Sequence, residues 1–249
     1  MIYVCIPTHN EATTIGVLLW KTRKVLDEFE RPFHVLVLDD ASTDDTPDVL
    51  ERYKHALPLT VIRSDERIGY GASVERLLRH VQRIAPYPKR DCAVVMQGDF
   101  TEDPQDIVPL VKTLEGGADI VAGHVTGERG VMPRAVKMVR WVAAKLLRGV
   151  VAKAPVSDPL AGLRVYRVIV LKKALRDLPE SDRLLHAEGW AANVELLATL
   201  APHARRIAEA PLDIRYDLQM RPSRFKPGQT LLGLARLRRL WSPPSPEVA

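Results

Sequence analysis

An apolar segment that ends in a cluster of polar side chains occurs three times in the first hundred residues. The clusters are residues 7–11, residues 39–46 and residues 97–99, and each follows a short apolar run. The intervening segments contain apolar residues at helical spacing. Strands that alternate with helices form mostly parallel, doubly wound sheets, and the carboxyl ends of parallel strands lie at one edge. The sequence therefore predicts an α/β fold with three polar clusters at the edge where such sheets bind ligands.

The second half of the chain has a different pattern. Residues 133–153 have the spacing of an amphipathic helix with a basic face. Residues 157–167 break this period and are expected to form a polar loop, while residues 207–214 are typical of an edge strand. Because the apolar content is 46% and no linker separates the halves, we expect one domain over residues 1–240 and a flexible, Pro-rich tail at residues 241–249.

Charge and cysteine content limit the possible partners and location. The net charge of +5 is concentrated in residues 129–153 and 215–239, which could face nucleic acid, an anionic bilayer or a phosphorylated substrate. Nucleic acid is disfavoured because no stacking aromatics or DNA-binding motifs accompany the basic residues. We find no membrane-spanning segment and no signal peptide, and expect Cys5 and Cys92 in buried strands. These features favour a reducing cytoplasm.

The acidic strand ends point to a nucleotide ligand. Asp39 and Asp40 can accept hydrogen bonds from a base or a ribose, whereas they would repel phosphate. Asp99 is the best candidate for a metal ligand, since a hard divalent ion that bridges two phosphates prefers carboxylate oxygen. The sequence contains no phosphate-binding loop of the nucleotide hydrolases and no Gly-x-Ser-x-Gly motif. Nucleotide-sugar binding is the chemistry that fits best.

Four motifs resemble the family-2 inverting glycosyltransferases of the GT-A fold. Residues 7–11 are similar to the family's Pro-Thr-Tyr-Asn-Glu opening and residues 38–46 to its Val-Asp-Asp-Gly-Ser-Thr-Asp-Gly-Thr segment. Residues 96–104 lie where the family carries its Asp-x-Asp metal motif. Residues 158–164 resemble the Asp-x-x-Ser-Gly-Phe-Arg segment of dolichyl- and polyprenyl-phosphate mannosyl- or glucosyltransferases. The resemblance implies inverting hexose transfer from GDP-mannose or UDP-glucose to a polyprenyl phosphate.

The resemblance also implies roles for individual residues. Residues 1–125 would form the nucleotide-sugar-binding half and residues 126–240 the acceptor-binding half. Asp99 and Thr101 would hold Mn²⁺ or Mg²⁺. The donor would be bound by Pro7, Thr8, His9, Glu11, Asp39, Asp40, Arg67, Gln97, Gly98, Asp99 and Arg224. The catalytic residues would be Asp99, Asp158, Glu188 and Arg164, with Arg164 and the basic helix meeting the acceptor's phosphate.

The chain departs from the family pattern at four positions. Gln97 replaces the first aspartate of Asp-x-Asp, so a metal would have one carboxylate instead of two, although a carboxamide oxygen can still coordinate. Ala161 replaces a serine, Arg224 a lysine and His9 a tyrosine. The substitution at position 97 keeps open a catalytically impaired nucleotide-binding module as an alternative.

The nature of the acceptor decides whether a base is needed. A phosphate acceptor is already an anion, whereas a hydroxyl acceptor on a glycan or small molecule would need a base such as Glu188 or Asp158. We favour a lipid phosphate because residues 158–164 match that subgroup and the basic helix precedes them. A sugar-phosphate nucleotidyltransferase is disfavoured, since residues 7–11 lack its Gly-rich loop. We expect a cytoplasmic protein, with peripheral contact at the inner face of the membrane as a further option.

Overall fold

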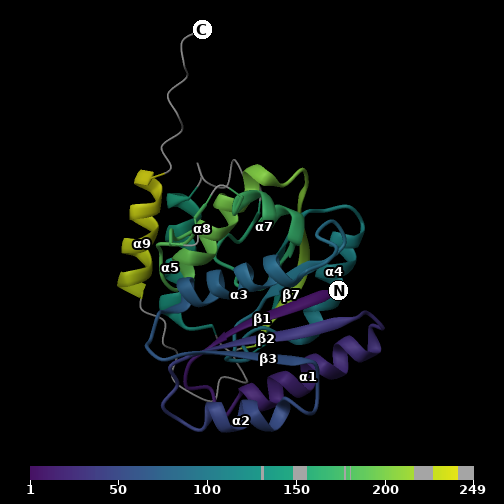
Figure 1. Ribbon diagram of the computed structural model, residues 1–249. Helices are drawn as coiled ribbons and strands as arrows, with labels where there is room; N and C mark the ends of the chain where they lie inside the picture. The colour runs from purple at the N-terminus through teal and green to yellow at the C-terminus, as the bar shows by residue number, and fades with distance from the viewer. Residues whose placement is uncertain (130–131, 148–155, 177, 180, 216–226, 241–249) are drawn as a thin grey trace.

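Seven strands form one sheet in the order β3-β2-β1-β4-β6-β5-β7 (Figure 1). The computed structural model describes the chain except for residues 130–131, 148–155, 177, 180, 216–226 and 241–249. The expected tail therefore lies outside the described residues. The sheet is parallel except at β6, which confirms the expected mostly parallel α/β architecture.

The elements alternate along the chain as the sequence predicts for its first half. The strands are β1 (Ile2–Thr8), β2 (Phe33–Asp40), β3 (Leu59–Ser64), β4 (Cys92–Val95), β5 (Ile120–Arg129), β6 (Arg164–Arg167) and β7 (Ile207–Arg215). The α-helices are α1 (Ile15–Glu28), α2 (Thr46–Tyr53), α3 (Tyr70–Ile84), α4 (Ile107–Glu115), α5 (Arg134–Leu146), α7 (Val168–Ala174), α8 (Trp190–Leu200) and α9 (Pro227–Leu240). Short 3₁₀ turns occupy Pro104–Asp106 and Ala201–His203.

Helices cover both faces of the sheet, so its central strands are buried. Every residue of β1 and of β4 is buried, as expected for parallel strands enclosed on both sides. Side chains of α1 and α4 pack in the core on one face, and those of α3, α7 and α8 pack in the core on the other. In Figure 1, β1 runs from the N-terminus on the right toward the side where α5 and α9 lie.

Strand β6 corrects the sequence-based expectation of a loop over residues 157–167. Its four residues pair antiparallel with β4, three of them also pair antiparallel with β5, and Val95 lies opposite Arg164. The apolar run of β6 is too short to stand out from a loop in the sequence, and its pairing joins segments far apart in the chain. The antiparallel direction places the start of β6 beside the carboxyl end of β4.

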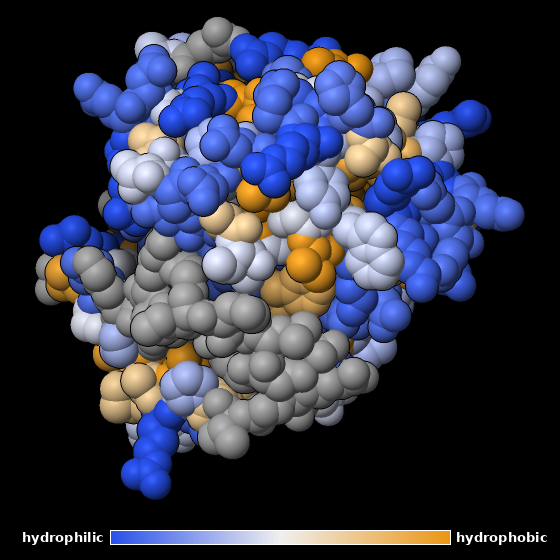
Figure 2. Space-filling view, turned by 90° about the horizontal axis from the view of Figure 1, so that it is seen from below, coloured by the Kyte–Doolittle hydropathy of each residue, from blue (hydrophilic) through white to orange (hydrophobic). Residues whose placement is uncertain are grey.

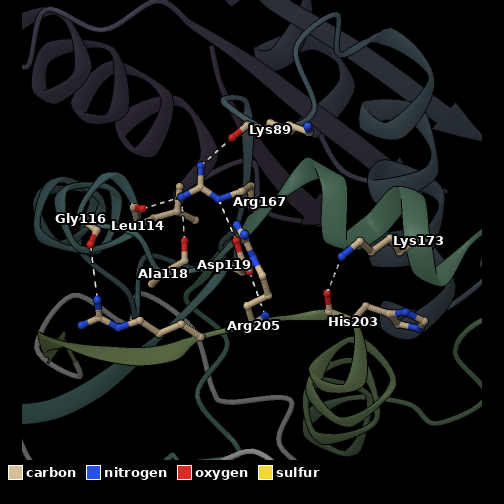
Figure 3. A network of polar contacts seen from close by, with 10 residues as sticks. Lys89, Leu114, Gly116, Ala118, Asp119, Arg167, Lys173, His203 and Arg205 are labelled. Atoms are coloured by element: carbon tan, nitrogen blue, oxygen red, sulfur yellow. Dashed lines mark hydrogen bonds and ion pairs between the residues drawn. The ribbon is translucent and has the colours of Figure 1, made fainter.

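A network of ion pairs and hydrogen bonds around the buried carboxylate of Asp119 fixes the opposite end of β6 (Figure 3). Arg167 donates to the Asp119 carboxylate at 3.1 Å and to the carbonyl oxygens of Leu114 and Ala118 at 2.6 and 2.8 Å. The backbone N–H of Arg205 donates to the same carboxylate at 2.9 Å. Burial opposes ionisation of Asp119, but the hydrogen bonds from Arg205 and the charges of Arg205 and Arg167 outweigh it and lower its pKa. The network joins β5, β6 and the segment before β7.

Helices α5 and α9 pack against the first half of α8 at the side toward which β1 runs (Figure 1). Val139 and Ala143 of α5, Val194 of α8, and Leu234 and Leu237 of α9 share one apolar cluster. These helices supply one wall of the cavity described below.

Among the coloured residues in Figure 2, hydrophilic ones predominate, and hydrophobic ones are exposed in small groups between them. Of the described helices, none combines the length and the hydropathy needed to cross a bilayer.

The carboxyl of Asp106, before α4, titrates far above its ordinary range. Burial raises its pKa from 3.8 to about 6, and the neighbouring charges of Asp103 and Asp213 add to the shift. Its Oδ2 accepts one hydrogen bond, from the backbone N–H of Asp213 at 3.1 Å. Because the folded chain holds this proton more tightly than the unfolded chain, the stabilisation is complete below about pH 4 and is lost as the pH rises through about 6.

We therefore expect Asp106→Asn to raise the free energy of unfolding at pH 7 by about 1 kcal/mol, a value discounted for partial exposure. The amide keeps an oxygen for the N–H of Asp213 and removes the buried charge. Urea unfolding at pH 7 and at pH 4 measures the effect, which should disappear at the lower pH. The same change in stability at both pH values would contradict this account.

Candidate functional site

A cavity of about 1060 Å³ opens at the carboxyl ends of β1 and β4. Strand ends and the turn before α3 supply its polar side, whereas α5, α8 and α9 supply much of its apolar side. The predicted site residues that line it are Pro7, Thr8, His9, Glu11, Asp40, Arg67, Gln97, Gly98, Asp99, Thr101 and Glu188.

Three predicted site residues that the structure describes are not found in the wall of this cavity. Asp39 is 1% exposed, and its Oδ1 accepts the N–H of Ser42 at 3.1 Å. Asp158 lines a second cavity of about 230 Å³. Arg164 is also 1% exposed and donates to the backbone carbonyls of Pro159 and Asn193. The expectation that Arg164 meets an acceptor phosphate is therefore corrected, because the guanidinium is buried against backbone. Arg224 lies outside the described residues.

Three loops at the sheet edge adopt a backbone conformation that non-glycine residues seldom take. Asn10, Ala41 and Phe100 have φ values of 52°, 53° and 64°, and they follow β1, β2 and β4 respectively. Side-chain hydrogen bonds hold two of these loops together: Ser42 accepts the N–H of Asn10 at 2.8 Å, and Asn10 accepts the N–H of Thr43 at 2.7 Å. Such local strain often accompanies binding sites, because it turns side chains toward a ligand.

Asp40 organises the turn that leads into α3. Its two carboxylate oxygens accept the N–H groups of Ile68 and Gly69 at 2.7 and 2.9 Å. The Nδ1 atom of His9 lies 2.7 Å from the backbone oxygen of Asp40. The turn presents Arg67 to the cavity. His9, Asp40 and Arg67 thus stand together at one end of the polar wall.

Asp99 is suited to a cation that also binds phosphate. Thr101 donates to Oδ1 of Asp99 from its hydroxyl at 2.6 Å and from its N–H at 3.1 Å. The described residues contain no group of three or more His, Cys, Asp or Glu side chains that could enclose a metal by themselves. Mg²⁺ and similar ions commonly bind one or two carboxylates and take their other ligands from phosphates and water. The residues therefore fit a divalent ion that arrives with a nucleotide.

Glu102 is a cavity residue that the sequence analysis did not identify. Its Oε2 accepts the backbone N–H of Gln97 at 2.8 Å, and a Cβ atom at Gly162 would lie 2.6 Å from its Oε1. Burial raises the pKa of Glu102 to about 7, and the charge of Asp99 adds to the shift. This carboxyl therefore joins the end of β4 to the loop before β6. An acidic residue two positions before a Pro is typical of the start of a helix, so the sequence did not indicate that Glu102 would line the cavity.

Buried carboxylates also hold the loop before α8. Glu75 accepts the N–H groups of Leu184 and Leu185 at 2.9 Å each, and Glu195 accepts those of His186 and Ala187 at 2.8 Å each. The loop also contributes a carboxylate of its own: Glu188 accepts the N–H of Gly71 in α3 at 3.3 Å.

Glu188 fills the space beside Gly69. That glycine has a φ of 89°, and a Cβ there would lie 2.6 Å from the Glu188 carboxylate. Burial raises the pKa of Glu188, while hydrogen bonds from Gly71 and Tyr70 oppose the shift. The expected catalytic role of Glu188 stays a prediction, and its observed contacts are with the start of α3.

The apolar side of the cavity carries two arginines that the sequence analysis did not assign individually to the acceptor. Arg140 of α5 lies 3.4 Å from Asp158 and places its guanidinium 5.8 Å from the centre of the Trp190 ring. Arg236 lines the cavity from α9, together with Leu232. Helix α9 follows residues 216–226, so only the tertiary fold could show that it meets the strand ends.

A family model and several curated proteins match this chain. The family model described as Glycosyl transferase family 2 matches residues 3–175. The undecaprenyl-phosphate 4-deoxy-4-formamido-L-arabinose transferase of Pseudomonas syringae pv. syringae is 27% identical over 51% of this chain and 36% of that protein. The dodecaprenyl-phosphate galacturonate synthase of Rhizobium johnstonii is 24% identical over 76% of this chain and 53% of that protein. The chain spans about half the length of the curated relatives it matches.

Solved structures share the fold at low sequence identity. The glucosyl-3-phosphoglycerate synthase of Mycobacterium tuberculosis, solved with Mn²⁺, UDP and glucosyl-3-phosphoglycerate, aligns with a TM-score of 0.60. It is 22% identical, and the match covers 95% of this chain and 76% of that one. The expected GT-A fold is thereby confirmed.

A substitution at Gly162 tests whether Glu102 fills the space beside this glycine. We expect Gly162→Ala to destabilise the chain by about 1–3 kcal/mol, because the new Cβ would displace the carboxylate that holds Gln97. Gly228→Ala is the matched control, since nothing lies within 4 Å of its added Cβ. Denaturant unfolding of both variants measures the difference. Equal stability of the two variants would show that Glu102 does not fill this space.

Proposed function

Because the chain belongs to glycosyl transferase family 2, we propose that it transfers a hexose from a nucleotide sugar to a polyprenyl phosphate with inversion at the anomeric carbon. The donor is of the GDP-mannose or UDP-glucose type. One observation carries the proposal: a single cavity joins the polar strand ends to an apolar wall that bears arginines. The names of two relatives, which refer to undecaprenyl and dodecaprenyl phosphates, support this acceptor class.

The donor lies along the polar wall. The carbonyl and carboxylate oxygens around His9 and Asp40 can accept hydrogen bonds from a base or a ribose, while Arg67 can pair with a phosphate. The sugar diphosphate lies beside Gly98, which lines the cavity and packs closely against β1. A Cβ at Gly98 would be 3.3 Å from Thr8 Oγ1. Pro7 and Glu11 complete this wall.

Asp99 and Thr101 hold Mn²⁺ or Mg²⁺ together with the diphosphate. When bound, such an ion stabilises the charge that develops on the leaving diphosphate. Gln97 offers an amide in place of a carboxylate, so the chain's own ligands bind the cation weakly until the nucleotide adds its phosphate oxygens. Glu102 holds the backbone of Gln97 and so keeps this edge in place.

A phosphate acceptor suits the observed contacts because it needs no general base. The Glu188 carboxylate accepts a hydrogen bond at the start of α3, and Asp158 forms an ion pair with Arg140. Asp158 and the buried Arg164 then act as positioning residues, since both fix the loop before β6. Transfer to a hydroxyl acceptor is the second candidate: the raised pKa of Glu188 would suit a general base if the carboxyl left α3 during the reaction.

Helix α5 supports contact with a membrane surface, where a lipid acceptor resides. Met138 and Trp141 are 51% and 61% exposed, and Lys145 Nζ lies 3.7 Å from the centre of the Trp141 ring. Tryptophan with an adjacent cation is typical of the interface between lipid headgroups and hydrocarbon. We propose a cytoplasmic enzyme that binds the inner face of the membrane through this helix.

Co-sedimentation with vesicles that contain anionic lipid tests this contact. We expect Trp141→Ser to reduce the bound fraction severalfold, since one exposed indole supplies much of the apolar area on this face of α5. Trp20→Ser on α1, which is 56% exposed, is the matched control. Equal loss in both variants, or no binding by the parent chain, would contradict the assignment to α5.

Thermal unfolding with nucleotides tests the donor site. We expect one of GDP, UDP, GDP-mannose or UDP-glucose to raise the melting temperature in the presence of Mn²⁺, because a ligand that binds only the folded state stabilises it. Asp99→Asn should abolish most of the manganese-dependent part of the shift while it keeps the size of the side chain. No shift with any nucleotide would contradict the donor site, and a shift without turnover of any nucleotide sugar would favour an impaired binding module.

A further inference from the structure

The cavity wall formed by α5 and α9 combines positive charge with apolar side chains. Arg140 and Arg236 line it from the two helices, and the apolar residues beside them include Val136, Leu232 and Leu237. The two helices share an apolar cluster, so their relative position is fixed by packing. A wall of this kind is complementary to a ligand with an anionic head and a hydrocarbon tail.

Contacts on two sides fix the position of the Arg140 guanidinium in this wall. It is paired with Asp158 on one side and stacks near Trp190 on the other. Its Nε is buried and has no hydrogen-bond partner among the described residues. Since a buried donor without a partner costs free energy, a phosphate oxygen that reached it would remove that cost.

Helix α9 adds an exposed cation and an exposed apolar side chain to this wall. Arg236 is exposed and lines the cavity. Leu232, one helical turn earlier, is 53% exposed and lines the same cavity. Residues four apart on a helix lie on one face, so Arg236 and Leu232 present a cation and an apolar side chain side by side.

We infer that α9 forms the acceptor subsite together with α5: Arg236 and Arg140 bind the phosphate of a prenyl phosphate, and Leu232 contacts its hydrocarbon chain. This inference rests on the proposed transfer to a lipid phosphate and names the residues that select it. It assigns to α9 the role that the sequence analysis gave to Arg164. The carboxylate of Glu188, which accepts the N–H of Gly71 at the start of α3, disfavours a phosphate at that part of the cavity.

Direct binding of farnesyl phosphate to the full chain, measured by calorimetry, tests the subsite without any need for turnover. We expect Arg236→Gln to weaken binding about tenfold or more, as loss of a charge-assisted hydrogen bond does, and Arg236→Lys to recover part of the affinity. Leu232→Asn should weaken binding of farnesyl phosphate and leave the weaker binding of inorganic phosphate unchanged. Arg76→Gln, an exposed arginine of α3 outside the cavity, is the matched control and should bind as the parent does.

Three results would overturn the inference: unchanged affinity in Arg236→Gln, equal weakening in Arg76→Gln, or inorganic phosphate that binds as tightly as farnesyl phosphate. The outcome is separable from that of the proposed function. Binding with the expected pattern but without sugar transfer to farnesyl phosphate would support the subsite and contradict the transferase proposal. Sugar transfer to a hydroxyl acceptor, with no binding of farnesyl phosphate, would overturn the subsite and support the second candidate function.

Discussion

The loops around the cavity depend on carboxylates that accept backbone N–H groups. A loop that leaves a buried sheet has N–H groups without partners in regular structure, and leaving them unpaired is costly. Asp40 pairs with the turn before α3, Glu102 with the end of β4, and Glu195 with the loop before α8. The chain thus uses negative charge to build the walls of its site, and only a part of that charge remains for a ligand.

This constraint explains how the two halves of the cavity meet. Strand β6 runs antiparallel between β4 and β5, which carries the loop before it to the edge where the acidic loops lie. Glu102 and Gly162 then bring the segment after β4 and the loop before β6 into contact. On the far edge, the network of Arg167 and Asp119 fixes the same strand. A four-residue strand therefore fixes how these two parts of the cavity wall meet.

Local patterns in the sequence predicted which strand ends meet at the polar wall of the cavity. The strands before Pro7, Asp39 and Gln97 are continuous apolar runs, and parallel topology brings their ends together without knowledge of distant contacts. The second half of the chain was less predictable, because residue type does not reveal whether a charged side chain faces the cavity or the chain itself. Arg164 carries the family motif yet is buried against backbone carbonyls, while Arg236 carries no motif and lines the cavity.

A crystal structure of the chain with Mn²⁺ and the nucleoside diphosphate that stabilises it most would test the central claim directly. The account predicts that the diphosphate lies beside Gly98, that Asp99 contacts the manganese, and that the base lies near Asp40 and Arg67, with the wall formed by α5 and α9 left open to an acceptor. A nucleotide bound elsewhere, or a diphosphate without contact to Asp99 or its metal, would contradict it.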